Sequence, residues 1–127
     1  MKLGILREEK IPVDRRTPFS PSQCKRIINV FPNIEIYVQS SKFRCYTDQE
    51  YLLNNISVLE DISFCDILFG IKEVPIDRLI SNKTYFFFSH TIKKQVYNRD
   101  LLKKMISLNI RMIDYEVLKF DNGKRIL

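Results

Sequence analysis

The chain has 127 residues, 45% of them hydrophobic, and a formal net charge of +6. This length and composition suit a single globular domain, 1–127, and exclude a disordered chain. The 21 basic residues are scattered among 15 acidic ones, so we expect no nucleic-acid partner, and the charge suits a surface that attracts small dicarboxylates.

The first strand is predicted at Lys2–Leu6, a short apolar segment that leads into a charged loop. Ser20 and Gln23 then form a capping box, with Pro21 at the first helical position. Apolar residues repeat at helical spacing from there until Pro32. The pattern predicts a strand, a loop and a helix. Because Met1 leads straight into the strand, we expect no secretory leader and a cytoplasmic protein.

The next elements repeat the order of strand and helix. Ile34–Val38 alternates between apolar and polar residues, which predicts a strand. Thr47 and Glu50 form a second capping box, which opens a short helix through Leu53. Asp66–Ile71 is nearly continuous in apolar residues, and strands of this kind are covered on both faces.

The second half of the chain continues the alternation. A strand is predicted at Thr84–Ser89, a helix at about Gln95–Leu108 and a further strand at Ile110–Tyr115. The apolar stripe of this helix consists of Leu101, Leu102, Met105 and Ile106. The alternation predicts an α/β fold with an open, mainly parallel sheet of about five strands and helices on both faces, Rossmann-like or flavodoxin-like. No apolar run approaches the ~20 residues of a membrane span, so no membrane partner is expected.

The C-terminal end predicts the start of a hairpin. Asn122 and Gly123 are a strong turn signal between Val117–Phe120 and Lys124–Leu127. The returning strand stops after two apolar residues, so we expect a truncated chain whose cut surface can self-associate.

Glycine and cysteine spacing argue against two kinds of site. The three glycines lie far apart, so the chain has no dinucleotide fingerprint, and we expect no cofactor-binding residue in it. Cys24, Cys45 and Cys65 share no C-x-x-C spacing, which favours reduced thiols over a disulfide frame or a metal site.

Titratable side chains follow four of the predicted strands. Arg16 lies in the loop after the first strand, Lys72 and Glu73 follow the apolar strand in the middle, His90 follows the next and Glu116 the last. The carboxyl ends of parallel strands share one edge of a sheet, and ligands of open α/β sheets bind at that edge. We therefore expect these side chains to face one cleft.

These residue types suit proton transfer and carboxylate binding. Imidazole exchanges protons near neutral pH, so His90 is the first candidate for an acid or base. A partly desolvated lysine amine, here Lys72, can act as a base or polarise a carbonyl, with Glu73 tuning it. Arg15 or Arg16 can hold a carboxylate through paired hydrogen bonds. Ordinary solvated charges are the alternative for each position.

Several segments resemble a known family. Gly4–Lys10, Asp14–Pro21 and Gly70–Pro75 resemble the N-terminal domain shared by alanine dehydrogenases, transhydrogenases and saccharopine dehydrogenases. Ser89–Lys93 with Gln95, followed by Ile110–Glu116, looks more similar still to one branch, the lysine-ketoglutarate reductase part of α-aminoadipic semialdehyde synthase. Lys83–Gln95 is the most specific portion of the match. The resemblance covers nearly the whole chain.

The resemblance implies the substrate-side domain of an oxidoreductase that condenses the lysine side-chain amine with 2-oxoglutarate. The imine is then reduced with NAD(P) to saccharopine, or the reaction runs backwards. By position it implies Lys72 and His90 as catalytic residues. The implied substrate-binding residues are Arg16, Glu73, Lys93, Gln95 and Glu116. A dinucleotide-binding domain is expected to follow, so the isolated chain is expected to be inactive in hydride transfer.

Two further functions stay open. An alanine dehydrogenase-like enzyme would share Arg16, Lys72 and His90, although the Ser89–Lys93 run argues against it. A stand-alone regulatory module would use the same cleft to bind a dicarboxylate or an amino acid. A nucleic-acid-binding role is a third alternative, and only the net charge supports it.

Overall fold

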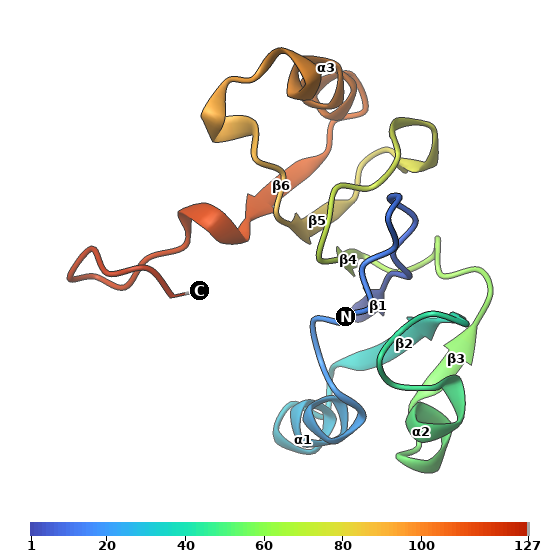
Figure 1. Cartoon of the computed structure of the whole chain (residues 1–127). Coiled ribbons are helices and arrows are strands. Elements are labelled where there is room, and N and C mark those ends of the chain that lie inside the picture. The colour runs from blue at the N-terminus through green and yellow to red at the C-terminus, as the bar shows by residue number, and fades with distance from the viewer. Residues whose placement is uncertain (127) are drawn as a thin grey trace.

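The chain folds around a six-stranded parallel sheet in the computed structural model, which describes residues 1–126 (Figure 1). The strands are β1 (Lys2–Ile5), β2 (Glu35–Gln39), β3 (Ser57–Leu59), β4 (Ile67–Phe69), β5 (Thr84–Phe87) and β6 (Arg111–Asp114). Their order is β3-β2-β1-β4-β5-β6, with every neighbouring pair parallel. The direction of winding therefore reverses between β1 and β4.

The predicted α/β class is confirmed, with one strand more than the sequence analysis identified. The additional strand is β3, which has three residues at the edge of the sheet and only Val58 half-buried. A strand this short and exposed leaves no apolar run to recognise. The other strands lie within two residues of their predicted bounds.

Within residues 1–126, three α-helices connect the strands: α1 (Pro21–Val30), α2 (Asp48–Leu53) and α3 (Arg99–Ser107). Both predicted capping boxes form, with Ser20 and Gln23 at α1 and Thr47 and Glu50 at α2. The third helix begins later than predicted, because Val96–Asn98 forms a separate 3-10 turn before it.

The helices cover both faces of the sheet, as predicted. On one face, α1 and α2 bury Cys24 and Tyr51 in a cluster with residues of β1 and β2. On the other face, α3 contributes Leu101 and Met105 to a cluster with β4 and β5. Figure 1 shows α1 and α2 near the β2 and β3 end of the sheet and α3 near the β6 end.

The predicted apolar stripe of α3 is wrong in part. Leu101 and Met105 are buried, whereas Leu102 is 44% exposed and Ile106 71% exposed. The helix has nine residues and meets the sheet along a narrow line, so a single pair spaced by four residues fills the contact.

The end of the chain forms the predicted turn without regular flanking strands. The Phe120 N–H donates to the Lys124 carbonyl at 2.8 Å, and Lys119 and Arg125 form an isolated antiparallel bridge. Tyr115–Val117 is a 3-10 turn, so the segment predicted to enter the hairpin as a strand does not begin as one. Leu127 lies outside the described residues. The turn projects away from the sheet (Figure 1).

Cys24 and Cys65 are buried and Cys45 is exposed. Burial raises the pKa of Cys24 to about 12 and that of Cys65 to about 11, so both stay protonated near neutral pH. Within residues 1–126, the helices are all too short or too polar to cross a membrane.

Candidate active site

The segments that follow β1, β4, β5 and β6 lie at the same edge of the sheet, because these four neighbouring strands are parallel. The Phe88 N–H donates to the Ile71 carbonyl at 3.0 Å. Ile71 directly precedes Lys72, and Phe88 lies two positions before His90. The bond therefore joins the segments that carry these two side chains. The edge lies at the reversal of strand order, where open α/β sheets bind ligands.

Arg16 is held by a neighbouring carboxylate in the loop after β1. Its Nη2 donates to Asp14 Oδ2 at 2.6 Å and its Nε to Asp14 Oδ1 at 3.0 Å. This pairing with Arg16 lowers the pKa of Asp14 to about 2. The Arg16 side chain remains 62% exposed, so the oriented guanidinium stays open to a ligand. Arg15 instead donates from Nε to the Phe43 carbonyl.

Glu8 is a half-buried carboxylate that the sequence analysis left without a role. Its oxygens accept the backbone N–H groups of Ile71 at 2.7 Å and Lys72 at 2.9 Å. Burial raises the pKa of Glu8, an effect that these two hydrogen bonds partly offset. Glu8 thus fixes the backbone that carries Lys72. In sequence it looks the same as Glu9, which pairs with Arg7.

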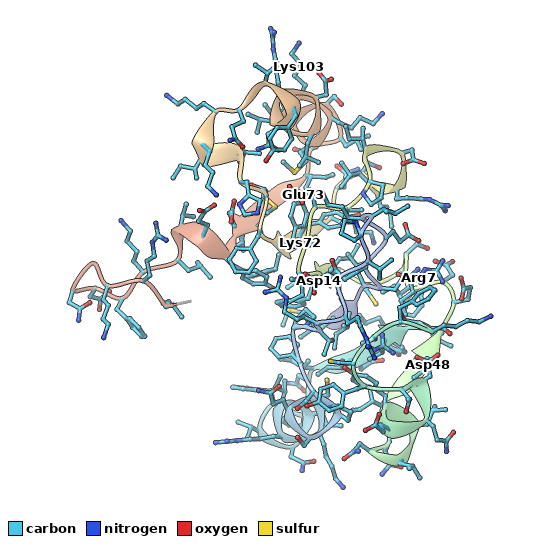
Figure 2. The ribbon with its side chains drawn as sticks, viewed as in Figure 1. Arg7, Asp14, Asp48, Lys72, Glu73 and Lys103 are labelled. Carbon is cyan, nitrogen blue, oxygen red and sulfur yellow. The ribbon has the colours of Figure 1, made fainter. Side chains whose placement is uncertain are left out.

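Lys72 lies close to Asp14, whose low pKa the lysine charge helps to maintain. Figure 2 shows Lys72, Glu73 and Asp14 together in the middle of the molecule. Lys72 lines a hollow of ≈ 160 Å³ with Glu8 and Glu73, and another of ≈ 400 Å³ with Lys10 and Asp14. Its side chain therefore reaches space that a ligand can enter.

Glu73 pairs with Lys10, not with the adjacent Lys72 that it was expected to tune. Glu73 Oε2 lies 2.7 Å from Lys10 Nζ, and the Glu73 side chain is 9% exposed. Sequence reasoning missed Lys10 because it is one of several charges in a long loop. Its contact with Glu73 spans 63 positions.

His90 forms a triad with two predicted residues, Glu116 and Lys93. His90 Nδ1 lies 3.2 Å from Glu116 Oε2, and Lys93 Nζ lies 3.4 Å from Glu116 Oε1. Lys93 Nζ is also 3.4 Å from His90 Nδ1, but one ring nitrogen cannot donate and accept together. The shorter, charge-assisted bond to Glu116 favours a proton on Nδ1, which leaves Nε2 free to accept one.

Through Tyr115 and Phe88, charge and packing connect the triad of His90, Glu116 and Lys93 to Glu8. Burial alone would raise the pKa of Glu116, yet the hydrogen bonds from His90 and Lys93 hold it below its usual value. Burial raises the pKa of Tyr115, and the charge of Glu8 adds to the rise. Phe88 stacks on His90 and packs edge-on against Tyr115, with ring centroids 6.4 Å and 5.1 Å apart.

Gln95 stands apart from these contacts. It is exposed, and its side chain makes no hydrogen bond within the part of the chain that the structure describes. His90 lines neither of the hollows beside Lys72. The geometry therefore brings Arg16, Lys72 and His90 to one edge and leaves Gln95 outside the cluster.

The arrangement can bind a carboxylate and move protons, but it does not fit a dinucleotide. Sheets of this topology hold pyrophosphate at a glycine-rich first turn and the following helix N-terminus. Here the segment after β1 carries Glu8, whose carboxylate already accepts the N–H groups at the crevice. The N-terminus of α1 is closed by the capping box of Ser20 and Gln23. A phosphate would meet negative charge and occupied donors.

Comparison with curated proteins identifies relatives over nearly the whole chain. Alpha-aminoadipic semialdehyde synthase from Arabidopsis thaliana is 36% identical over 129 residues, which cover 98% of this chain and 12% of that protein. The mitochondrial enzyme of the same name from Mus musculus is also 36% identical, with 98% and 13% covered. Saccharopine dehydrogenase [NAD(+), L-lysine-forming] from Yarrowia lipolytica is 26% identical, with 95% and 34% covered. The chain thus spans about an eighth to a third of these relatives.

Solved structures share the fold at lower identity. Transhydrogenase from Sinorhizobium meliloti superposes with a TM-score of 0.77 at 14% identity, covering 94% of this chain and 36% of that one. An L-alanine dehydrogenase superposes with a TM-score of 0.77 at 16% identity, covering 98% and 35%. Residues 4–127 match the family described as alanine dehydrogenase/PNT, N-terminal domain. The chain belongs to the alanine dehydrogenase/PNT N-terminal domain family.

Proposed function

We propose that this chain is the substrate-side domain of a saccharopine dehydrogenase or lysine-ketoglutarate reductase-like enzyme. The reaction would join the lysine side-chain amine to 2-oxoglutarate and reduce the product to saccharopine, or run in reverse. The observation that carries the proposal is that a guanidinium, an amine and an imidazole lie along one sheet edge, two of them held by carboxylates. The relatives named for this chemistry support it.

Arg16 would bind one carboxylate of the dicarboxylate substrate. Asp14 holds the guanidinium through Nε and Nη2, so the side chain is oriented before substrate arrives. Its exposed remainder can donate in parallel to both oxygens of a carboxylate. Lys72 lies beside the same loop, since its charge helps to lower the pKa of Asp14.

Lys72 and His90 would divide the proton transfers. The substrate amine must lose a proton before its nitrogen forms a bond to the ketone carbon. The carbinolamine oxygen must then gain a proton so that the carbon–oxygen bond can break and water leave. We assign the exchange with nitrogen to Lys72 and the exchange with oxygen to His90. Glu116 would hold the imidazole and stabilise its charged form.

Reduction of the imine requires a nicotinamide, which supplies hydride. We assign no residue of this chain to it, because the crevice does not fit a dinucleotide phosphate. On this proposal a dinucleotide-binding domain would belong to another part of a longer protein. This chain would supply the substrate and proton-transfer side.

A titration of the chain with 2-oxoglutarate, followed by backbone NMR, tests the carboxylate site. We expect the signals of Arg16, Lys72 and His90 to move together. Arg16→Lys should weaken binding by roughly tenfold to a hundredfold, because it replaces a planar pair of donors with a point charge. Arg26→Lys is the matched control, since Arg26 is an exposed residue of α1. Shifts confined to other surfaces, or equal loss in both variants, would reject the site.

A further inference from the structure

Ser89 and Thr91 flank His90 and have no part in the proposed reaction. Ser89 is completely buried, which is unusual for a hydroxyl side chain unless it is hydrogen-bonded. Its partner is Asp114, the last residue of β6, which is 8% exposed. Both sit in the interior next to the triad of His90, Glu116 and Lys93.

Asp114 holds the residues on both sides of His90, Ser89 directly and Thr91 through the Ser89 hydroxyl. Asp114 Oδ2 accepts the Ser89 N–H at 3.2 Å and also contacts the Ser89 hydroxyl. The Ser89 oxygen accepts the Thr91 N–H at 3.2 Å and lies 2.8 Å from the Thr91 hydroxyl. One carboxylate thereby fixes the residue before His90 directly and the residue after it through one hydroxyl.

The other oxygen of Asp114 fixes the partner of the imidazole. Asp114 Oδ1 accepts the Glu116 N–H at 2.9 Å. Glu116 is the carboxylate that contacts His90 Nδ1. The same side chain therefore sets the backbone position of both members of the His90 and Glu116 pair.

The His90 backbone shows why such support is needed. His90 has φ of 55°, in the left-handed region that costs energy for residues other than glycine. Its carbonyl also accepts a hydrogen bond from the Asn98 side chain at 3.0 Å. Surrounding bonds must hold this conformation, and Asp114 makes two of them, to the N–H and the hydroxyl of the preceding Ser89.

We propose that Asp114 is a positioning residue that sets the orientation and the ring tautomer of His90 by acting through Ser89 and Glu116. The inference rests on the proposed function for its catalytic meaning. With Glu116 fixed, Nδ1 keeps its proton in both the neutral and the charged imidazole, so Nε2 is the nitrogen that takes up a proton and then gives it to the substrate oxygen. Without Asp114, the loop and Glu116 move independently and the tautomer is no longer selected.

Imidazole ¹⁵N NMR of the chain tests the tautomer, and His90 is the only histidine, so its ring signals need no assignment. At alkaline pH, the wild-type ring should carry its proton on Nδ1. Asp114→Asn should shift the ratio toward the Nε2–H form by roughly two- to tenfold, because the loss of one hydrogen bond has an effect of that size. Asp100→Asn, an exposed acid in the first turn of α3, is the control and should keep the wild-type ratio.

A second variant covers the case in which Asp114→Asn does not fold. Ser89→Ala removes a single hydroxyl, leaves Asp114 charged and should shift the tautomer ratio in the same direction. A folded Asp114→Asn with the wild-type ratio overturns the inference. If that variant is unfolded, a wild-type ratio in Ser89→Ala overturns it instead.

Kinetics of the full-length enzyme separate this inference from the proposed function. Asp114→Asn should lower kcat by about tenfold to a hundredfold, because a small misplacement of a catalytic group has an effect of that size. KM for 2-oxoglutarate should stay unchanged, because Arg16 is held by Asp14. An altered tautomer with unchanged kcat would overturn the catalytic role. Absence of the lysine and 2-oxoglutarate activity in wild type would reject the proposed function, while the NMR ratio would still decide the positioning role.

Discussion

On the proposed function, replacing His90 with asparagine is expected to lower kcat of the full-length protein by about 10²- to 10⁴-fold, the usual contribution of a general acid or base. Asparagine is the substitution of choice because His90 has φ of 55°, and asparagine adopts this left-handed conformation more readily than most residues. The loop should keep its shape and lose the imidazole. Steady-state kinetics with lysine and 2-oxoglutarate measure the effect.

Lys103→Gln is the control for this substitution. Lys103 is an exposed residue of α3 at the top of Figure 2, whereas Lys72 lies in the middle, and the loss of Lys103 should leave kcat unchanged. Proton transfer by a side chain contributes about 10²-fold or more. If the His90→Asn enzyme keeps kcat within about twofold of wild type, His90 takes no part in proton transfer.

Replacing Lys72 with methionine is expected to lower kcat by about 10²-fold or more, because the amine exchanges protons with the substrate nitrogen in the proposed reaction. Methionine matches the lysine stem in length and leaves the backbone bonds from Ile71 and Lys72 to Glu8 in place. The measurement is kcat with and without a small primary amine. An added amine can occupy the vacated space and should restore part of the rate.

Lys103→Met is the matched control for Lys72→Met, since it removes the same group from an exposed helix. A Lys72→Met enzyme that only raises KM, with kcat intact, would show that the lysine binds substrate and takes no part in proton transfer. A similar rise in kcat of the control enzyme on addition of the same amine would show that the added amine acts elsewhere.

The fold was predictable where local chemistry decides it. Ser20 with Gln23 and Thr47 with Glu50 satisfy helix ends within four residues, so their capping boxes can be read directly from sequence. The β3 strand and the exposure of Ile106 could not be read this way. Both depend on how a short element packs against the sheet, and residues distant in the chain determine that packing.

The positions of the candidate site residues followed from the strand ends, but their partners did not. Because parallel strands end at one edge, Lys72 and His90 could be expected there. The pairing of Glu73 with Lys10 and the contacts of Glu8 and Asp114 join segments 25 or more positions apart. In sequence, each of these acids resembles any surface carboxylate.

Glu8, which the sequence analysis left without a role, bears on which ligand the crevice can accept. Strand order alone suits a nucleotide, since the winding reverses beside β1. The half-buried Glu8 carboxylate accepts the backbone N–H groups of Ile71 and Lys72 at that point, and the Arg16 charge acts on it. On the proposed function, the substrate carboxylate would bind to Arg16 beside Glu8, and no phosphate would take the place of Glu8.

The most direct test of the proposed function is a substrate comparison with the protein encoded by the complete reading frame. It would be assayed with lysine and 2-oxoglutarate, and separately with pyruvate and ammonia, each with NADH and with NADPH. We predict saccharopine formation from the first pair and no alanine from the second. Alanine formation alone would indicate an alanine dehydrogenase. Turnover of neither pair, with 2-oxoglutarate still bound by the chain, would contradict the enzyme and leave a dicarboxylate-binding module.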